Sequence, residues 1–423
     1  MRLSIAMLLV LTLAACNLGQ VPVNETVTNP TPVTGERLVV AWVDAGNLVV
    51  WQSGETLPRR IASGGVVQPF IAPDGRHVVF TRGPQGRAET LWVVDVAGTA
   101  EQQLVGERPA GYNPGENQVG DVVWSDERTI YINTLLQQAP FYEPRNDLYR
   151  IDIITRELSL IAVPSAGGRI ALSPDREHLV TVYHGTYGRQ DGVVRVVDFF
   201  GREDPDNLLF FRGVSTASEF RFYPDVYWSG DSENVLLAIP DPDLVYSNID
   251  GEETAETTLW QIPVDSPSQR GIIGTVQASF FGLPQWSFDG SAMTFLRRTS
   301  DSNQFTVYLA DGNGENPVAI YGGSVGEIEP PIWLPGSNRF IYAQPITGGN
   351  GTRTYYISGV GLEPVRLSDE PMFRLQFVTD EQFVYVAEGD GRLDLRFRGI
   401  GGESQFIGSL STVPIFDAVY VME

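Results

Sequence analysis

The chain has 423 residues, of which 42% are hydrophobic and 11% aromatic, so it can bury a large core and is not a disordered protein. It carries 52 acidic residues against 29 basic ones, a formal net charge of −23. Because so acidic a surface repels phosphate backbones, nucleic-acid binding is excluded as the expected function.

The N-terminus has the pattern of an export signal. Arg2 precedes an apolar run, residues 3–13, that is too short to span a bilayer, and the sequence LAAC ends at Cys16. This motif resembles the bacterial lipobox, which implies that residues 1–15 are removed and that Cys16 is diacylated. The alternative is an ordinary secretory signal with an incidental thiol. Because two acyl chains anchor a protein stably, we expect a lipid-anchored, extracytoplasmic protein of the bacterial cell envelope.

The next segment, residues 16–36, is rich in Pro, Thr, Asn and Val and has no apolar periodicity. This composition is typical of a flexible tether. Cys16 is the only cysteine of the chain, so no disulfide is available to hold the folded part together. We therefore expect one globular domain, residues 37–423, that the tether connects to the membrane.

A repeat extends through that domain. The segment PQWSFDGSAMTFLRR, which begins at Pro284, has related copies, and the aligned positions are 44 to 58 residues apart. These positions are Ile71, Trp124, Leu172, Trp228, Trp286, Trp333 and Phe377. Each unit has four short runs of β-branched and aromatic residues, and no capped helical periodicity is found. A strand-rich repeat of this length predicts an all-β fold, a single β-propeller of four-stranded antiparallel blades.

The most recognisable residues of the repeat have an expected structural role. A large aromatic side chain at the start of the inner strand fills the wedge between neighbouring blades. The Phe-Asp-Gly or Pro-Asp-Gly that follows is a tight turn, in which glycine adopts a positive φ. We therefore expect these residues to build the fold and to bind no ligand.

The two ends of the domain complement each other. Residues 37–63 supply a second, third and fourth strand but no aromatic first strand, whereas residues 414–416 match residues 284–286 at the start of an inner strand. The C-terminal strand would then join the N-terminal blade and remove the exposed edges. This predicts eight blades. Seven blades is the alternative, if the divergent unit around Leu172 or the terminal strand packs differently.

The units that begin at Pro69 and Pro284 resemble the repeats of TolB-like, WD-type bacterial propellers. The resemblance covers residues 37–423, although the other units are more divergent. It implies a propeller that binds or scaffolds at the cell envelope. It implies no catalytic residues, because the shared motif is structural.

Catalytic motifs are scarce. Similar repeats precede serine peptidase domains, which need a Gly-x-Ser-x-Gly elbow and a downstream histidine. The nearest match starts at Gly322 in an expected loop, and His77, His178 and His184 all precede it. No zinc motif, cysteine cluster or phosphate-binding loop occurs, so we expect no metal and no cofactor. A glycan-active hydrolase or lyase with paired carboxylates in the central pocket is the enzymatic alternative.

The expected binding surface follows from the topology of a blade. Connections from strand two to three, and from strand four to the next blade, emerge on one face, and the longest segments of this chain all fall in those positions. Their aromatic and arginine side chains are of the kind that interfaces use, although several rings could instead pack onto the blades. The candidate ligand-binding residues of this long-loop face are Tyr112, Phe141, Tyr142, Tyr187, Arg189, Arg221, Phe222, Tyr223, Tyr246 and Phe281.

Together these patterns predict a noncatalytic, envelope-anchored lipoprotein, expected to be a monomer. Its propeller would bind or scaffold a protein or a glycan through the long-loop face. Which ligand it binds does not follow from the sequence.

Overall fold

The computed structural model describes residues 36–109, 111–138, 141–185, 190–197, 206–216, 221–246, 254–299, 304–324, 328–346, 352–389 and 391–422. The predicted signal peptide, Cys16 and the tether up to residue 35 lie outside them. The chain divides into two compact units, residues 1–31 and 32–423, and every described residue belongs to the second. None of the helical segments in the described ranges is long and apolar enough to cross a membrane.

The described residues form strands and three short 3-10 turns, as the all-β prediction expected. The turns are η1 (Pro84–Gly86), η2 (Pro267–Gln269) and η3 (Phe280–Gly282). Apart from one parallel pair, the strands are grouped into antiparallel sheets, and each sheet is named after its lowest-numbered strand. The β1 sheet has the order β3-β2-β1-β35 and contains β1 (Glu36–Asp44), β2 (Asn47–Gln52), β3 (Arg59–Ala62) and β35 (Phe416–Met422).

The next three sheets follow in chain order. The β4 sheet contains β4 (Val66–Ile71), β5 (His77–Arg82), β6 (Thr90–Asp95) and β7 (Gln102–Val105). The β8 sheet contains β8 (Asn117–Trp124), β9 (Thr129–Gln138), β11 (Leu148–Asp152) and β12 (Leu158–Ala162), and β10 (Phe141–Pro144) pairs with the far end of β9. The β13 sheet contains β13 (Arg169–Leu172), β14 (Leu179–Tyr183), β15 (Gly192–Val197) and β16 (Asp206–Phe211).

Two further four-stranded sheets and a small parallel pair come next. The parallel pair is β17 (Ser215–Thr216) and β20 (Val245–Tyr246). The β18 sheet contains β18 (Tyr227–Trp228), β19 (Asn234–Pro240), β21 (Thr254–Pro263) and β22 (Gly271–Ser279). The β23 sheet contains β23 (Gln285–Trp286), β24 (Ala292–Arg298), β25 (Gln304–Asp311) and β26 (Val318–Ser324).

The remaining strands form an eight-stranded sheet with two halves, which are connected through the pair Arg353 and Met372. The β27 half contains β27 (Ile332–Trp333), β28 (Arg339–Pro345), β29 (Arg353–Gly359) and β30 (Leu362–Arg366). The β31 half contains β31 (Met372–Phe377), β32 (Gln382–Gly389), β33 (Arg392–Gly399) and β34 (Gln405–Leu410).

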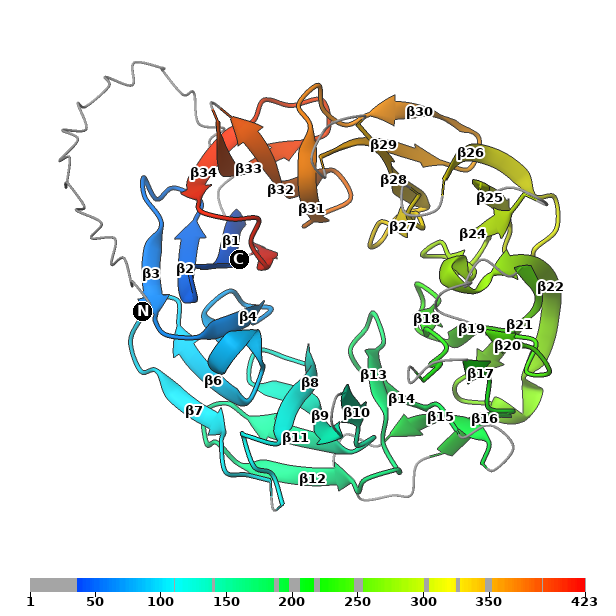
Figure 1. Ribbon diagram of the computed structural model, residues 1–423, viewed down its shortest axis with the longest axis horizontal. Coiled ribbons are helices and arrows are strands. Elements are labelled where there is room, and N and C mark those ends of the chain that lie inside the picture. The colour runs from blue at the N-terminus through cyan, green and yellow to red at the C-terminus, as the bar shows by residue number, and fades with distance from the viewer. Residues whose placement is uncertain are drawn as a thin grey trace, which may run out of the picture. The chain divides into compact units, whose positions relative to one another are not determined.

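Within residues 36–422, the sheets follow one another in chain order around an axis, with β4, β8, β13, β18, β27 and β31 on the inner side (Figure 1). This is the blade arrangement of a β-propeller. Second strands such as β14 are buried along their whole length, because each sheet is packed on both faces. Outer strands such as β30 are exposed throughout.

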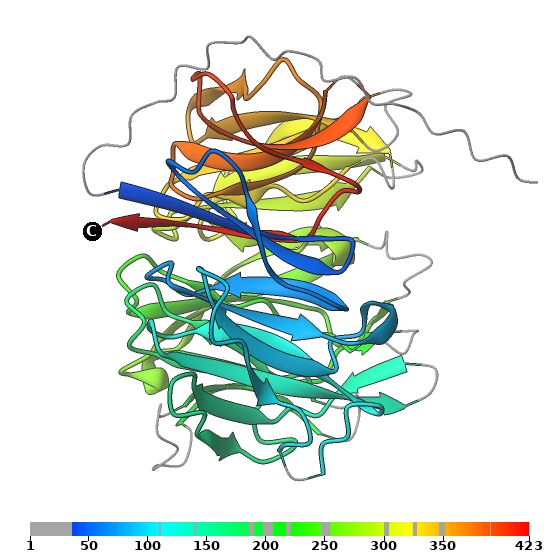
Figure 2. The same cartoon turned by 90° about the vertical axis from the view of Figure 1, so that its left-hand side faces the viewer.

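The C-terminal strand lies beside the N-terminal one. β35 pairs antiparallel with β1, from Glu36 opposite Met422 to Trp42 opposite Phe416, and Figure 2 shows the two strands side by side. The C-terminal strand β35 therefore supplies the first strand that the N-terminal unit lacks. The same strand contacts two more sheets, because the carboxylate of Asp417 accepts hydrogen bonds from the backbone N of Ile71 (2.7 Å) and from Nε2 of Gln376 (3.1 Å).

Apolar clusters pack most neighbouring sheets against each other. Seven sheet-to-sheet contacts have a cluster of this kind: β1 with β4, β4 with β8, β8 with β13, β13 with β18, β18 with β23, the β27 half with the β31 half, and the β31 half with β1. The contact between the β23 sheet and the β27 half is different. It is made by the stacked rings of Tyr321 and Tyr342, 4.3 Å apart, and by hydrogen bonds from Trp333.

Three of the repeated tryptophans, Trp124, Trp286 and Trp333, have the structural role that the sequence predicts. Trp286 is 2% exposed and donates from Nε1 to the carbonyl oxygen of Gly312. Trp124 and Trp333 donate from Nε1 to backbone oxygens of the preceding sheet, at 3.3 and 2.9 Å. A buried indole with its N–H satisfied fixes neighbouring blades and is not available to a ligand.

The turns after β13, β18 and β23 share a hydrogen-bonded serine and aspartate. Ser287 donates from Oγ to Asp289 (2.9 Å) and accepts from the backbone N of Ala292 (3.0 Å), while Asp289 accepts from the backbone N of Ser291 (2.9 Å). Burial raises the pKa of Asp289, but these hydrogen bonds outweigh it and bring the pKa to about 2. Gly290 completes the turn at φ 72°, a conformation that costs glycine little.

A glycine at the corresponding position of the β13 sheet is expected to stabilise the protein. There, Arg176 has φ 64°, in the same Ser-x-Asp turn, built on Ser173 and Asp175. Arg176→Gly should raise the free energy of unfolding by about 1 kcal/mol, because a side chain with a Cβ is strained in this region. Arg176→Ala, which keeps the Cβ, is the matched control. Urea unfolding of the three proteins measures this, and an equal effect of glycine and alanine would contradict it.

Candidate functional site

The long-loop face is described best between the β8 and β23 sheets. Two of its connections, one before β18 and one between β19 and β21, pair with each other through β17 and β20. Ser215 lies opposite Val245, and Thr216 lies opposite Tyr246. This pairing confirms that the two long connections lie on the same face. It also holds the two connections together at these residues.

Stacked rings fix these connections to the next sheet. Tyr246 stacks on Phe280 of η3 with ring centroids 4.6 Å apart, and Phe222 lies 5.6 Å from the same ring. Phe281 lies 5.9 Å from Phe280 and is half exposed. Aromatic contacts of this geometry stabilise beyond their buried area. The result is a single packed surface built from connections of neighbouring sheets.

A buried hydrogen bond attaches the β8 sheet to the same surface. Tyr223 donates from Oη to Oδ1 of Asn146 over 2.8 Å, and both residues are buried. Asn146 adopts φ 53° just before β11. Below it, Asp147 accepts hydrogen bonds from the backbone N (2.7 Å) and Oγ1 (2.5 Å) of Thr134. Burial raises the pKa of Asp147, although these bonds and the nearby Arg145 oppose the rise.

His184 lies between the rings of two tyrosines. It stacks on Tyr183 at 4.8 Å and meets Tyr223 edge-on at 5.1 Å. Its Nδ1 is within hydrogen-bond distance of the carbonyl oxygen of Gly185, so Nδ1 carries the proton and donates. Burial lowers the pKa of His184, the bond to Gly185 opposes this, and the charge of Arg221 lowers it further, to about 4. The imidazole is therefore neutral at pH 7.

This neutral histidine predicts a loss of stability in acid. As the pH falls below 6.5, the unfolded chain gains a proton that the folded His184 does not accept until about pH 4. The free energy of unfolding should drop by about 1–2 kcal/mol over that window, after allowance for partial exposure. Urea unfolding of wild type and His184→Gln at about pH 7 and 4.5 tests this. The variant should lose less stability, and an equal loss in both proteins would contradict the assignment.

Four of the ten candidate residues have buried side chains: Tyr112, Phe222, Tyr223 and Tyr246. In this structure these four rings contact neighbouring protein groups, so they are placed to position their loops. Tyr112, for example, donates from Oη to the carbonyl oxygen of Glu89 over 2.8 Å and belongs to the cluster between the β4 and β8 sheets.

Two candidates, Arg221 and Phe281, are exposed at the surface of this face. The candidates whose side chains fall outside the described part are Phe141, Tyr142, Tyr187 and Arg189. The backbones of Phe141 and Tyr142 are part of strand β10. Exposed apolar side chains lie on both β20 and η3, because Val245 of β20 is as exposed as Phe281 of η3.

The sequence analysis missed Arg169, which is the first residue of β13 and not part of a loop. Its guanidinium carbon lies 5.0 Å from the ring centroid of Tyr223, and its Nη1 lies 4.0 Å from Oδ1 of Asp225. Arg221 is similarly far from its acidic neighbour, with Nη2 3.8 Å from Oε1 of Glu143. Both arginines are about half exposed, and exposed pairs at this separation are weak.

No site for a metal is built from the described residues, since no group of three His, Cys, Asp or Glu side chains is placed to hold one. Two inner-strand carboxylates are bonded within the protein. Asp121 accepts from Nδ2 of Asn133 over 2.8 Å, and Asp417 accepts from two other sheets. Burial raises the pKa of Asp417, against its hydrogen bonds. These contacts give both carboxylates a structural role.

The sheets and their order around the axis define the class: the chain is a β-propeller protein. No protein-family model matches it, and no curated protein matches its sequence. Its fold is similar to that of a eukaryotic initiation factor structure, at TM-score 0.53 and 11% identity, over 91% of this chain and 98% of that one. It is also similar to Porphyromonas gingivalis dipeptidyl peptidase 4, at TM-score 0.53 and 13% identity, over 82% of this chain and 53% of that one.

A TolB structure from Acinetobacter baumannii is a more distant match. It has a TM-score of 0.34 and 13% identity, over 68% of this chain and 65% of that one, and carries no argument about function. At such identities the likenesses concern the fold alone.

Proposed function

We propose that this protein is a noncatalytic binding or scaffolding protein of the bacterial cell envelope, which holds a partner on its long-loop face. The observation that carries the proposal is the joining of connections from neighbouring sheets into one packed surface. The β17–β20 pair and the Tyr223–Asn146 bond fix the loops before any partner arrives. Preorganised loops lose less conformational entropy on binding.

The chemistry of the surface favours a protein partner, with a glycan as the second ligand class. Val245 and Phe281 present exposed apolar side chains, and Arg169 and Arg221 present guanidinium groups. Aromatic and arginine side chains beside an apolar centre are typical of protein interfaces. The arginines suit carboxylates of an acidic peptide or of an acidic glycan.

We further infer that the propeller has eight blades and that β35 closes it. The β1, β4, β8, β13, β18 and β23 sheets and the two halves of the last sheet would each be one blade. The apolar clusters between consecutive sheets support this, as does the pairing of β35 with β1. A closed arrangement has no free inner edge at which another chain could pair.

The membrane attachment is also part of the proposal. Cys16 would be the acylated residue, and the tether up to residue 36 would hold the propeller outside the membrane. A glycan-active hydrolase or lyase is the alternative function. The hydrogen bonds of Asp121 and Asp417 do not support this alternative, because both carboxylates bond to other parts of the protein.

A pulldown from solubilised envelope with the full chain tests the binding face. The variant is Val245→Ser with Phe281→Ser, and the matched control is Leu57→Ser with Ile154→Ser, exposed apolar residues on connections of the opposite face. A partner should be retained by wild type and control and reduced by about ten-fold or more with the variant. Equal recovery by all three proteins would contradict the proposed face.

A further inference from the structure

The contact between the β23 sheet and the β27 half is the least apolar of the described contacts between neighbouring sheets. The nearest apolar cluster, around Leu296, Phe305 and Val307, includes no residue of the β27 half. The stacked rings of Tyr321 and Tyr342 and hydrogen bonds from Trp333 connect the two instead. Trp333 donates from Nε1 to the carbonyl oxygen of Gln285 (2.9 Å) and to Oγ1 of Thr294 (3.1 Å). The outer part of this contact, next to β26 and β30, is not filled by these side chains.

A groove with a volume of about 1020 Å³ occupies that outer part. One wall comes from β24, β25 and β26, and the other from β28, β29 and β30. The turn between β29 and β30 forms its rim, which places the groove toward the short-turn face, away from the long-loop face. Three exposed apolar side chains line it, Val318, Val360 and Leu362, at 63, 56 and 54% exposure.

The charge of the groove is acidic. Asp311 and Glu363 line it, and both are exposed. Arg339 is the cation of the lining, and its Nη2 donates to the carbonyl oxygen of Asp380 and lies 3.5 Å from Oε1 of Glu381. Its guanidinium group thus lies beside two acids, Asp380 and Glu381, that are not part of the lining. A basic ligand is favoured in such a site, and an acidic one is repelled.

The geometry also indicates how a ligand is held. β30 is an exposed outer strand, but Pro364 lies in its middle and has no N–H to offer to an added strand. Strand addition to β30 is therefore disfavoured. Binding must instead insert apolar side chains between the two walls. The volume matches the upper end of ordinary ligand pockets, about 300–1,000 Å³, so several side chains of a short segment fit.

We propose that this groove binds a short, extended segment of a partner protein that combines apolar side chains with lysine or arginine. The apolar side chains cover Val318, Val360 and Leu362, and the basic ones face Asp311 and Glu363. This second binding surface is separate from the long-loop face, so the two proposals succeed or fail independently.

Selection from a random peptide library displayed on phage, with immobilised full-length protein as the target, tests the proposal. Enriched peptides should contain apolar and basic residues. Synthetic copies should bind wild type and lose affinity by about ten-fold or more to Val360→Ser with Leu362→Ser, which removes apolar contact without changing the charge of the groove. Val318→Ser, on the opposite wall, should have the same effect if the first variant is destabilised. Ile272→Ser, at an exposed residue of β22, is the matched control and should leave binding unchanged.

Other outcomes would overturn the proposal. These are the absence of enriched peptides, enrichment of acidic ones, or equal binding to the groove variants and wild type. Tighter binding of a synthetic peptide of residues 17–35 would make the occupant the protein's own tether. A concentration-dependent dimer in sedimentation velocity that the groove variants abolish would make it a second copy of this chain.

Discussion

A chain that ends at Thr412 is expected not to fold cooperatively. The deletion removes β35, whose seven residues pair with β1, and it exposes Leu38 and Trp42 of the neighbouring cluster. It also removes Asp417, which bonds to the β4 sheet and to the β31 half. The lost pairing and burial should exceed about 5 kcal/mol, which is comparable to the whole stability of an ordinary domain.

Urea unfolding followed by tryptophan fluorescence measures this effect. The truncated chain should show no cooperative transition, and a synthetic peptide of residues 413–423 added in trans should restore one. Asp417→Asn in the full chain is the control, since it keeps the strand and the shape of the side chain. A truncated chain with the wild-type midpoint would show that β35 does not hold the ends together.

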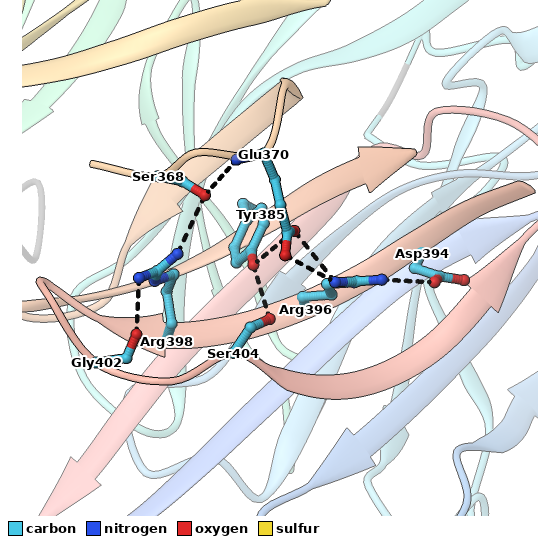
Figure 3. Close-up of polar contacts among 8 residues, drawn as sticks. All are labelled: Ser368, Glu370, Tyr385, Asp394, Arg396, Arg398, Gly402 and Ser404. Atoms are coloured by element: carbon cyan, nitrogen blue, oxygen red, sulfur yellow. Dashed lines mark hydrogen bonds and ion pairs between the residues drawn. The ribbon is translucent and has the colours of Figure 1, made fainter. Parts of the chain in front are cut away.

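Arg396→Met is expected to destabilise the protein by about 2–3 kcal/mol. Figure 3 shows Arg396 between two carboxylates, with Nη2 3.1 Å from Oδ2 of Asp394 and Nη1 3.1 Å from Oε2 of Glu370. The Asp394 side chain is 6% exposed, so removal of its main partner leaves a largely buried charge. Arg392, at 3.7 Å, and Ser409, at 3.1 Å, compensate only in part.

This network ties the β31 half to the connection that precedes it. Glu370 lies between β30 and β31, and Arg398 donates to Oγ of Ser368 in the same connection and to the carbonyl oxygen of Gly402 (Figure 3). The β31 unit has Phe377 at the position where four other units have tryptophan. In this unit the polar network is an additional connection between its strands and the preceding segment.

Two controls separate the network from general surface effects. Arg396→Met combined with Asp394→Asn should recover part of the lost stability, because the unpaired charge is removed as well. Arg366→Met breaks an exposed pair with Asp369 and should change the free energy of unfolding by less than about 0.5 kcal/mol. Equal losses for Arg396→Met and Arg366→Met would contradict the role of the network.

The strand framework was predictable because the repeat carries it locally. Trp124, Trp286 and Trp333 mark inner strands, and the serine, aspartate and glycine after Trp286 form the turn that their spacing predicts. The complementary ends of the domain predicted the pairing of β35 with β1. The tryptophan and turn signals lie within a few residues and recur in several units.

The binding face was harder to predict, because burial of a loop residue depends on partners far away in the sequence. Tyr223 is buried by its bond to Asn146, 77 residues earlier, and Tyr246 by its stacking on Phe280. The two-residue strands β17 and β20 are too short to leave a pattern. Arg169 was not predicted as a surface residue of this face, because it is part of a strand, where side chains are usually expected to pack.

The measurement that tests the proposed function most directly is site-specific photo-crosslinking of the full-length protein in intact cells. A photoreactive amino acid is placed at Phe281 on the long-loop face, or at Ile272 on the outer strand β22. The proposed function predicts a discrete crosslinked partner from position 281 that is absent from position 272. The same products from both positions, or none from position 281, would contradict a binding role for the long-loop face.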